Sequence, residues 1–174
     1  MASGNTDRPR GFIAVKTTHG GPPKRTPYYN TGTAVIYRGD AVKKGTGGQV
    51  ASATADTDLI FGVAAEFNDA ADTTDSAEVM IYDDLENTIF EAQCADSTVA
   101  GDTMINLFYD INIGTATTTL DSSVMEVATG GSVQDTILVI GRVVKPKNNY
   151  GKWVDVYCKF HVNPNASVVI HTSS

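Results

Sequence analysis

The most conspicuous absence from this 174-residue chain is that of basic residues in its middle. From Gly45 to Gly141 there is no lysine or arginine, whereas these 97 residues contain 17 of the 20 carboxylates. The first 44 and the last 33 residues carry all 13 cations, with net charges of +6 and +4. Because such separation creates surfaces of opposite potential, we expect one surface to bind a partner and another to face solvent. The net charge of −7 argues against a nucleic-acid-binding protein, whose domains are usually basic.

Long apolar runs and paired cysteine motifs are also missing. No run approaches the ~20 apolar residues of a membrane helix, and no apolar stretch follows Met1 as it would in a secretory signal. We therefore expect a soluble protein, made in a cytoplasm, with no membrane partner. Cys94 and Cys158 lie far apart and form no CxxC motif. We expect both thiols to be buried and reduced, a disulfide between them being the alternative.

Leucine is scarce, and β-branched residues take its place. The chain has 5 Leu against 18 Val, 11 Ile and 21 Thr, and β-branched side chains pack well on pleated sheets. The predicted fold is all-β, a small β-barrel or β-sandwich of short strands. A helical turn is allowed only between Ala64 and Ala71. The strands expected after the first thirty residues are Thr33–Arg38, Gln49–Ala53, Leu59–Ala65, Glu78–Tyr82, Thr88–Cys94, Thr103–Tyr109, Val124–Ala128, Thr136–Val144, Lys152–Val162 and Ser167–Thr172.

Residues 1–30 are predicted to be an extended N-terminal arm, followed by a β domain at residues 31–174. Prolines near both ends of this segment disfavour regular structure. The stretch Gly11–Thr18 between them is capable of forming one strand. Such an arm is suited to pairing with the sheet edge of a partner, although a frayed terminus has the same composition.

A weak internal repeat divides the β domain at about residues 33–94 and 95–165. The run from Leu59 to Ala65 resembles the run from Leu138 to Val144, and an alternating strand follows each. Gly62 and Gly141 occupy matching positions inside these strands, where glycine usually marks a bulge or a sharp bend. Two related β units are therefore expected, with chance similarity between valine-rich strands as the alternative.

No pattern of residues indicates catalysis, a metal or a cofactor. The chain lacks a G-x-S-x-G elbow, a P-loop and a dinucleotide-binding fingerprint. The histidines, His19, His161 and His171, do not form a recognisable ligand set. The carboxylates between Asp69 and Glu78 lack the spacing and glycine of a calcium loop, so a solvated loop is expected, with weak cation binding as the alternative. We expect a protein that is not an enzyme.

Three consecutive segments, Ala34–Gly45, Gly48–Ala55 and Leu59–Glu66, resemble the capsid decoration (cement) proteins of tailed bacteriophages. In that family a valine-rich strand, a G-D-x-V turn, a strand ending in A-T and an I-x-G-V-A strand follow one another. The match covers residues 34–66. The resemblance implies a compact β fold without enzymatic activity, attached to the outside of an assembled head. It also implies a trimer, and an N-terminal arm that becomes ordered on the shell.

Charge pattern and resemblance together predict a structural virion protein on the outer capsid surface, whose partners are the major capsid protein and further copies of itself. The expected capsid-binding residues are the cations Arg8, Arg10, Lys16, Lys24 and Arg25 and the apolar anchors Phe12, Ile13 and Val15. A surface-exposed glycan- or receptor-binding module is the alternative, with Tyr28, Tyr29, Tyr150 and Trp153 as the stacking side chains. Against it, Trp153 and Tyr157 are expected in the core. A third possibility is a hydrolase with a carboxylate-bound metal.

Overall fold

The computed structural model describes residues 5–30, 35–69, 78–95, 101–114, 122–128 and 136–161, and within these ranges the chain is all-β. Two short 3-10 helices, η1 (Thr46–Gly48) and η3 (Asp102–Met104), interrupt the strands. No helix in this part of the chain is long and apolar enough to cross a membrane. The strands are β1 (Ile13–Thr17), β2 (Thr26–Tyr29), β3 (Ala41–Lys44), β4 (Val50–Ser52), β5 (Ile60–Ala64), β6 (Glu78–Tyr82), β7 (Thr88–Gln93), β8 (Phe108–Tyr109), β9 (Ile111–Asn112), β10 (Glu126–Val127), β11 (Ile137–Arg142) and β12 (Asp155–Phe160).

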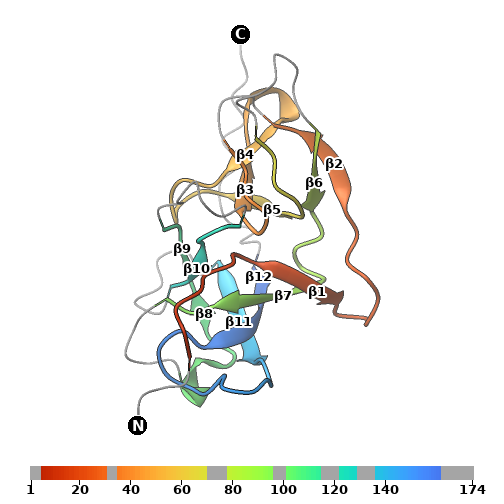
Figure 1. Ribbon diagram of the computed structural model, residues 1–174. Coiled ribbons are helices and arrows are strands. Elements are labelled where there is room, and N and C mark those ends of the chain that lie inside the picture. Colours follow the sequence, from red (N-terminus) through yellow and green to blue (C-terminus); the bar gives the residue numbers. More distant parts are fainter. Residues whose placement is uncertain are drawn as a thin grey trace.

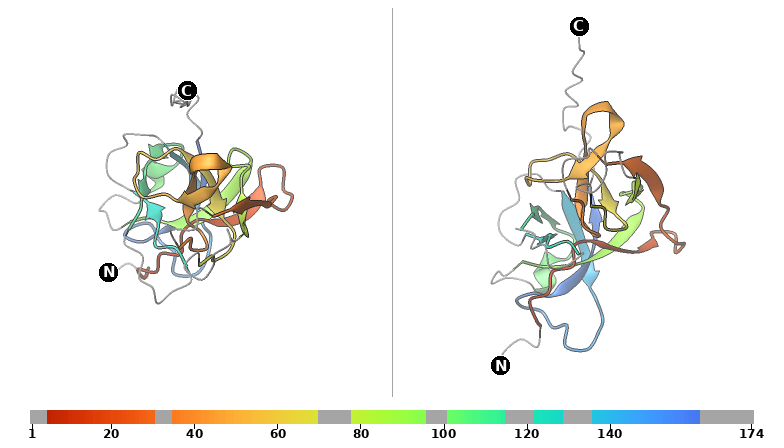
Figure 2. Two further views of the ribbon diagram at one scale, coloured as in Figure 1. Left: turned by 90° about the horizontal axis from the view of Figure 1, so that it is seen from above. Right: turned by 45° about the horizontal axis from the view of Figure 1, so that its top comes forward.

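The strands form three antiparallel sheets, none of which closes into a barrel within the described ranges. Sheet I has the order β1-β7-β12-β11-β8, sheet II has the order β2-β6-β5-β3-β4, and β9 pairs with β10. In Figure 1 sheet II occupies the upper half of the molecule, sheet I the lower half, and the β9–β10 pair one side. Figure 2 shows the same separation from a second direction. The predicted all-β fold class is confirmed, and the open sheets are consistent with a β-sandwich of short strands.

The larger hydrophobic core joins sheet I to one face of sheet II, where Ala41 and Val63 contribute to it. On β12 the side chains of Val156, Cys158 and Phe160 are buried and alternate with half-buried neighbours, as expected for a strand with one face on a core. The ring of Phe160 lies 4.9 Å from that of Phe12 and 5.4 Å from that of Phe90, both in edge-on contact. This aromatic trio links the segment before β1 to β7 and β12.

A smaller core lies on the other face of sheet II, so this sheet is apolar on both sides. Ala41 and Val63 face the larger core, whereas their neighbours Val42 and Ala64 face the smaller one. Ile36 covers the smaller core from a segment that is bridged to Asn68. A central strand buried on both faces explains why the sequence around residues 60–64 is apolar without alternation.

The glycines of the predicted repeat both follow a β-bulge. Pairing of β5 with β3 skips Phe61, directly before Gly62, and pairing of β11 with β12 skips Ile140, directly before Gly141. A Cβ at Gly62 would collide with the side chain of Ile81, but one at Gly141 would meet open space. Glycine is therefore required by close packing at the first position only.

Besides the bulge, the two predicted repeat units share the pairing of the bulged strand with the strand that follows it, but not the strands beyond. Each bulged strand pairs with the next strand along the chain, β5 with β6 and β11 with β12. The outer neighbours differ, since β6 pairs with β2 whereas β12 pairs with β7. Because β7 lies within residues 33–94 but belongs to sheet I, the two sheets do not correspond to the two predicted sequence units.

Several expected strands are corrected by the structure. Residues 35–38, part of the expected strand Thr33–Arg38, form only isolated bridges. Part of the expected strand Thr103–Tyr109 is the 3-10 helix η3. Residues 64–69 contain no helical turn. Strands β2, β3 and β9 were not expected, because each is short and follows a turn signal or contains proline. The expected strand Ser167–Thr172 lies outside the described residues.

The prediction of an extended arm at residues 1–30 is wrong for residues 5–30. Strand β1 pairs with β7 in sheet I, and β2 pairs with β6 in sheet II. Phe12 is 1% exposed and belongs to the larger core. Proline did not prevent pairing in β2, because an edge strand needs donors on one side only. The N-terminal segment thus contributes one edge strand to each large sheet.

Candidate functional site

The segment of residues 5–12 runs along the end of sheet I and is held there by one buried side chain. The amide nitrogen of Gln93 donates to the backbone oxygens of Thr6 (2.9 Å) and Trp153 (3.2 Å). Its amide oxygen accepts the backbone N–H of Arg8 at 2.9 Å. Gln93 is 5% exposed, so its polar atoms depend on these partners. The arrangement fixes the backbone of Arg8 against the end of β7.

The segment of residues 5–12 ends where the backbone at Gly11 passes closely over Gly39, in the turn before β3. Gly11 and Gly39 have φ values of +66° and +89°, and the N–H of Phe12 donates to the carbonyl of Gly39 at 2.9 Å. A Cβ at Gly39 would lie 2.7 Å from the carbonyl oxygen of Arg10, and one at Gly11 would collide with Gly39 itself. The turn at Gly39 and Asp40, within residues 34–66, therefore contacts the N-terminal segment directly.

The adjacent Asp40 completes that turn rather than a reactive site. Its carboxylate accepts the backbone N–H of Tyr37 at 3.0 Å and the hydroxyl of Ser52 at 2.8 Å. Burial raises the pKa of Asp40, although hydrogen bonds from Ser123, Tyr37 and Ser52 oppose this. Every one of these contacts supports the turn, so the Gly39–Asp40 pair has a structural role here.

A cleft lies between residues 5–10, which form one wall, and the loop at residues 145–153, which forms the other. This loop is built around Asn148. The side-chain nitrogen of Asn148 donates to the carbonyls of Val143 (2.7 Å) and Asp155 (2.8 Å), and its oxygen accepts the N–H of Asp155 at 2.8 Å. Asn5 ties the two walls together by donating to the carbonyls of Asn149 and Lys152 at 2.7 and 2.8 Å. Residues more than 140 positions apart thus lie side by side.

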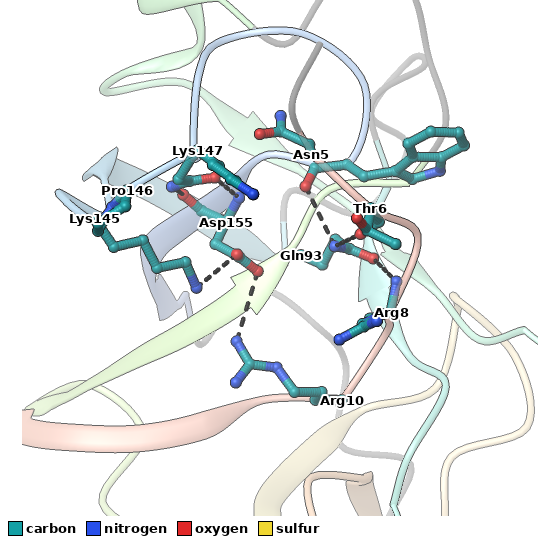
Figure 3. A pocket seen from close by; sticks show the side chains of 11 residues that line it. Asn5, Thr6, Arg8, Arg10, Gln93, Lys145, Pro146, Lys147 and Asp155 are labelled. Atoms are coloured by element: carbon teal, nitrogen blue, oxygen red, sulfur yellow. Dashed lines mark hydrogen bonds and ion pairs between the residues drawn. The ribbon is translucent and has the colours of Figure 1, made fainter.

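Four charged side chains form a network between these walls. Lys145 binds Glu91 at 2.7 Å and Asp155 at 2.6 Å. Arg10 binds Glu91 at 2.8 Å and approaches Asp155 to 3.7 Å. Figure 3 shows Arg10 and Lys145 both directed at Asp155. The two basic ends of the sequence therefore meet in space, at carboxylates from β7 and β12.

The network shifts the pKa of two of its members. Burial raises the pKa of Glu91, but the ion pairs with Lys145 and Arg10 outweigh it and hold that pKa below its ordinary value. Burial lowers the pKa of Lys145, but its bonds to Asp155 and Glu91 outweigh that effect and raise it. Both groups are therefore charged at neutral pH.

An open cleft of about 370 Å³ lies beside the network. Its walls also carry Arg8 and Lys147, whose exposed side chains form no hydrogen bond or ion pair with another described residue. Figure 3 shows both side chains at this cleft. The lining residues are Asn5, Thr6, Arg8, Arg10, Gln93, Lys145, Pro146, Lys147, Asn148, Trp153 and Asp155.

The predicted capsid-binding residues do not lie together. Arg8 and Arg10 line the cleft, whereas Lys24 and Arg25 are exposed in the connection between β1 and β2. Lys16 and Val15 are exposed on β1, and Ile13 is half-buried beside them. The expectation that Phe12 is an anchor for a partner is wrong, because Phe12 is buried in the chain's own core.

The cleft also contains residues that the sequence interpretation did not single out. Lys145, Lys147 and Asp155 come from the basic C-terminal region, and Gln93 comes from the end of β7. The +4 charge of residues 142–174 was the available signal. It could not name partners, because no local pattern links Gln93 or Lys145 to residues 5–10.

Within the described part of the chain, the groups capable of other chemistry are dispersed or buried. Among the described residues no three His, Cys, Asp or Glu side chains are placed to hold a metal ion. Cys94 and Cys158 are buried and not bonded to each other, as expected. His161 lies against the ring of Phe108 at 5.0 Å, His19 is exposed, and His171 lies outside the described residues. Most of the acidic loop between Asp69 and Glu78 also lies outside them.

The aromatic residues considered for glycan binding divide into two groups. Tyr28 donates to Asp83 at 2.9 Å and packs on Phe61, so it is engaged internally. Tyr29 is 54% and Tyr150 38% exposed. The expectation that Trp153 and Tyr157 lie in the core is wrong, since both are half-buried and Trp153 lines the cleft.

Among known proteins, no protein-family model, no curated sequence and no solved structure matches this chain.

Proposed function

We propose that this chain is a non-enzymatic structural protein of a tailed bacteriophage, which binds the outer surface of an assembled capsid and stabilises it. The observation that carries the proposal is the polarity of the molecule. Four of the 13 cations, Arg8, Arg10, Lys145 and Lys147, come from the two basic regions of the sequence and line one cleft, whereas residues 45–141 supply carboxylates and no cation. One surface is thereby suited to a partner, and the acidic remainder keeps a crowded particle surface soluble.

The phage-like segment supports the proposal from a second direction. Within it, residues 35–66 fold as one unit, in which β3 pairs with both β4 and β5. The Gly39–Asp40 turn of that unit receives the N-terminal segment at Gly11. The motif that resembles decoration proteins therefore helps to position Arg8 and Arg10 at the cleft.

Attachment to a shell would stabilise it by mass action, because a ligand that binds only the assembled state favours that state. Single exposed ion pairs contribute only about 0–1 kcal/mol each, so useful strength requires many copies acting together. The proposal places the protein on the outside of the virion, with the major capsid protein as its partner and a homotrimer as its assembled form.

The test is to mix the purified full chain with undecorated phage heads, and to measure co-sedimentation and the temperature at which the heads release DNA. Saturable binding and a higher release temperature are expected, with bovine serum albumin as a control for trapping in the pellet. Heads that sediment without the chain would refute the proposal. Light scattering on the free chain tests the trimer.

A glycan-binding surface module is the second candidate, and Trp153 at the cleft is the observation that favours it. An indole beside polar side chains is able to stack on a sugar ring. A glycan array separates the candidates, since specific hits that are lost in Trp153→Ala would support this function, and an empty array would remove it.

A further inference from the structure

We propose that the cleft binds an acidic peptide segment of the shell protein, with a carboxylate of that segment held between Arg8 and Lys147. The inference rests on the proposed function and adds to it the place of contact and the chemistry of the partner. Three properties of the cleft lead to it: its spare charge, the fixed backbone of its two spare cations, and its apolar wall.

The spare charge follows from the ion-pair network. Arg10 and Lys145 are occupied by Glu91 and Asp155, at distances of 2.6–2.8 Å for the three shortest pairs. Arg8 and Lys147 have no such partner among the described residues. Four cations against two carboxylates give the site a net charge of +2, which attracts an anionic group.

Both spare cations project from backbone that is already fixed. The N–H of Arg8 is bound by Gln93, and Lys147 occupies the turn closed by the bond from the N–H of Asn148 to the carbonyl of Lys145, at 3.2 Å. Asn148 in turn is 4% exposed and bonded to the backbone on both sides of the loop. A site whose backbone is ordered before binding loses less conformational entropy when a ligand arrives.

The shape and the wall of the cleft favour a peptide as the ligand. A volume of about 370 Å³ fits a few residues and lies in the usual range for ligand sites. Trp153 and Pro146 add apolar surface beside the cations, which suits an aliphatic neighbour of an acidic side chain. A nucleic acid needs a longer cationic track, whereas the carboxylate-rich residues 45–141 would repel it.

Trp153 is the only tryptophan of the chain, so its fluorescence reports directly on the cleft. The full chain is titrated with a capped peptide of sequence Glu-Glu-Leu-Glu-Glu, and with its Gln-Gln-Leu-Gln-Gln counterpart. We expect a saturable fluorescence change with the acidic peptide, weakened by salt. For the glutamine peptide we expect an affinity that is lower by about tenfold or more.

The double variant Arg8→Gln, Lys147→Gln removes the spare cations, and Arg38→Gln, Lys44→Gln is the matched control. The control removes the same charge from exposed positions just before β3 and at its end, outside the cleft. We expect the first variant to bind the acidic peptide about tenfold more weakly and the control to bind it normally. Thermal melting confirms that both fold. Equal affinity for the two peptides, or an unchanged affinity in the cleft variant, would overturn the inference.

Phage heads separate this inference from the function on which it rests. If the wild-type chain fails to bind heads, the proposed function fails, and the peptide titration still decides the ligand chemistry of the cleft. If the cleft variant binds heads as well as the wild type does, the function stands and the inference is refuted. Dissociation of an oligomer in the cleft variant would also refute it, because the occupant would then be a second copy.

Discussion

At the scale of single residues, two buried amides and two glycines decide how residues 5–12 and the loop at residues 145–153 are held. Gln93 and Asn148 each make three hydrogen bonds to backbone groups. Gly11 and Gly39 permit two backbones to touch where any side chain would intervene. These positions order the walls of the cleft.

Gly11→Ala is expected to destabilise the protein by about 2–4 kcal/mol, since a left-handed conformation and a backbone collision add together. Gly47→Ala is the control, because Gly47 has φ +73° but open space around its Cβ. The control should cost only about 1 kcal/mol. Urea unfolding of both variants measures the difference, and equal losses would contradict the close approach of Gly11 to Gly39.

Both thiols are expected to be inert in the folded protein. Burial, with smaller contributions from Asp155 and Glu126, raises the pKa of Cys94 to about 12, and burial raises that of Cys158 further. A thiol reagent at pH 8 should therefore react with neither cysteine until denaturant is added, because the thiolate is the reactive form. Rapid reaction of one equivalent in the native state would show that a thiol is accessible.

At the scale of elements, the segment of residues 5–12 behaves as part of sheet I although it contains no strand before β1. It is bonded to β7 through Gln93 and Glu91 and to the loop after β11 through Asn5. Three elements that are distant in sequence therefore depend on one another. Loss of a single contact should loosen the segment and the cleft together.

Gln93→Ala should release this segment, at a cost of about 1–3 kcal/mol for the backbone groups left without partners. Trypsin is the readout, because the bond after Arg10 lies in the released stretch. Faster cleavage there is expected, while Asn87→Ala, which removes one exposed hydrogen bond to Asp84, should leave the rate unchanged. An unaltered cleavage rate in Gln93→Ala would argue that other contacts hold the segment.

The ion-pair network predicts a particular dependence on pH. The pKa of Glu91 lies below its ordinary value of 4.5 in the folded state, so its contribution is present above that value and lost as the pH falls through the folded pKa. The pKa of Lys145 lies above 10.5, so its contribution is present below that value and lost as the pH rises through the folded pKa. Both contributions are therefore present at neutral pH.

Glu91→Gln should accordingly reduce the free energy of unfolding by about 1 kcal/mol at pH 7, a modest figure because Lys145 and Arg10 are partly exposed. Once the pH is below the folded pKa of Glu91, the variant and the wild type should converge, since the carboxyl is then protonated. Urea unfolding at pH 7 and at successively lower pH tests this. A difference that persists in acid would assign the effect to packing rather than to charge.

At the scale of the whole molecule, residues 5–30 and the two large sheets are interdependent. Strands β1 and β2 place residues 13–17 and 26–29 at the edges of sheets I and II, and Phe12 lies in the core between them. A leader that attaches and detaches as a unit is incompatible with this arrangement. The partner-binding surface that we propose is therefore preformed, and residues 5–10 form one wall of it.

Phe12→Ala tests that integration and should destabilise the whole protein by about 3–5 kcal/mol, the cost of deleting a buried aromatic side chain. Val15→Ala is the matched control, because Val15 is three residues away and 43% exposed. It should cost less than about 1 kcal/mol. Thermal melting followed by circular dichroism compares them, and equal melting temperatures would restore the hypothesis of a separate leader.

The sequence by itself determined the fold class, the bulges and the separation of charge. Abundant β-branched residues favour pleated structure through local sterics, and Gly62 and Gly141 mark bulges because a glycine within a strand weakens regular pairing. Burial of the cysteines also follows from residue type. All of these are local properties, which a short stretch of chain carries wherever it lies in the fold.

Only the tertiary structure decided that residues 5–30 belong to the sheets and that the basic ends meet. The sequence of β2 contains a proline and predicts irregular structure, but β2 forms a strand because it pairs with β6 in sheet II. Arg10 and Lys145 are like charges that would repel, and they come together because Glu91 and Asp155 lie on adjacent strands between them. Such pairings depend on long-range burial and hydrogen bonding, which no local pattern encodes.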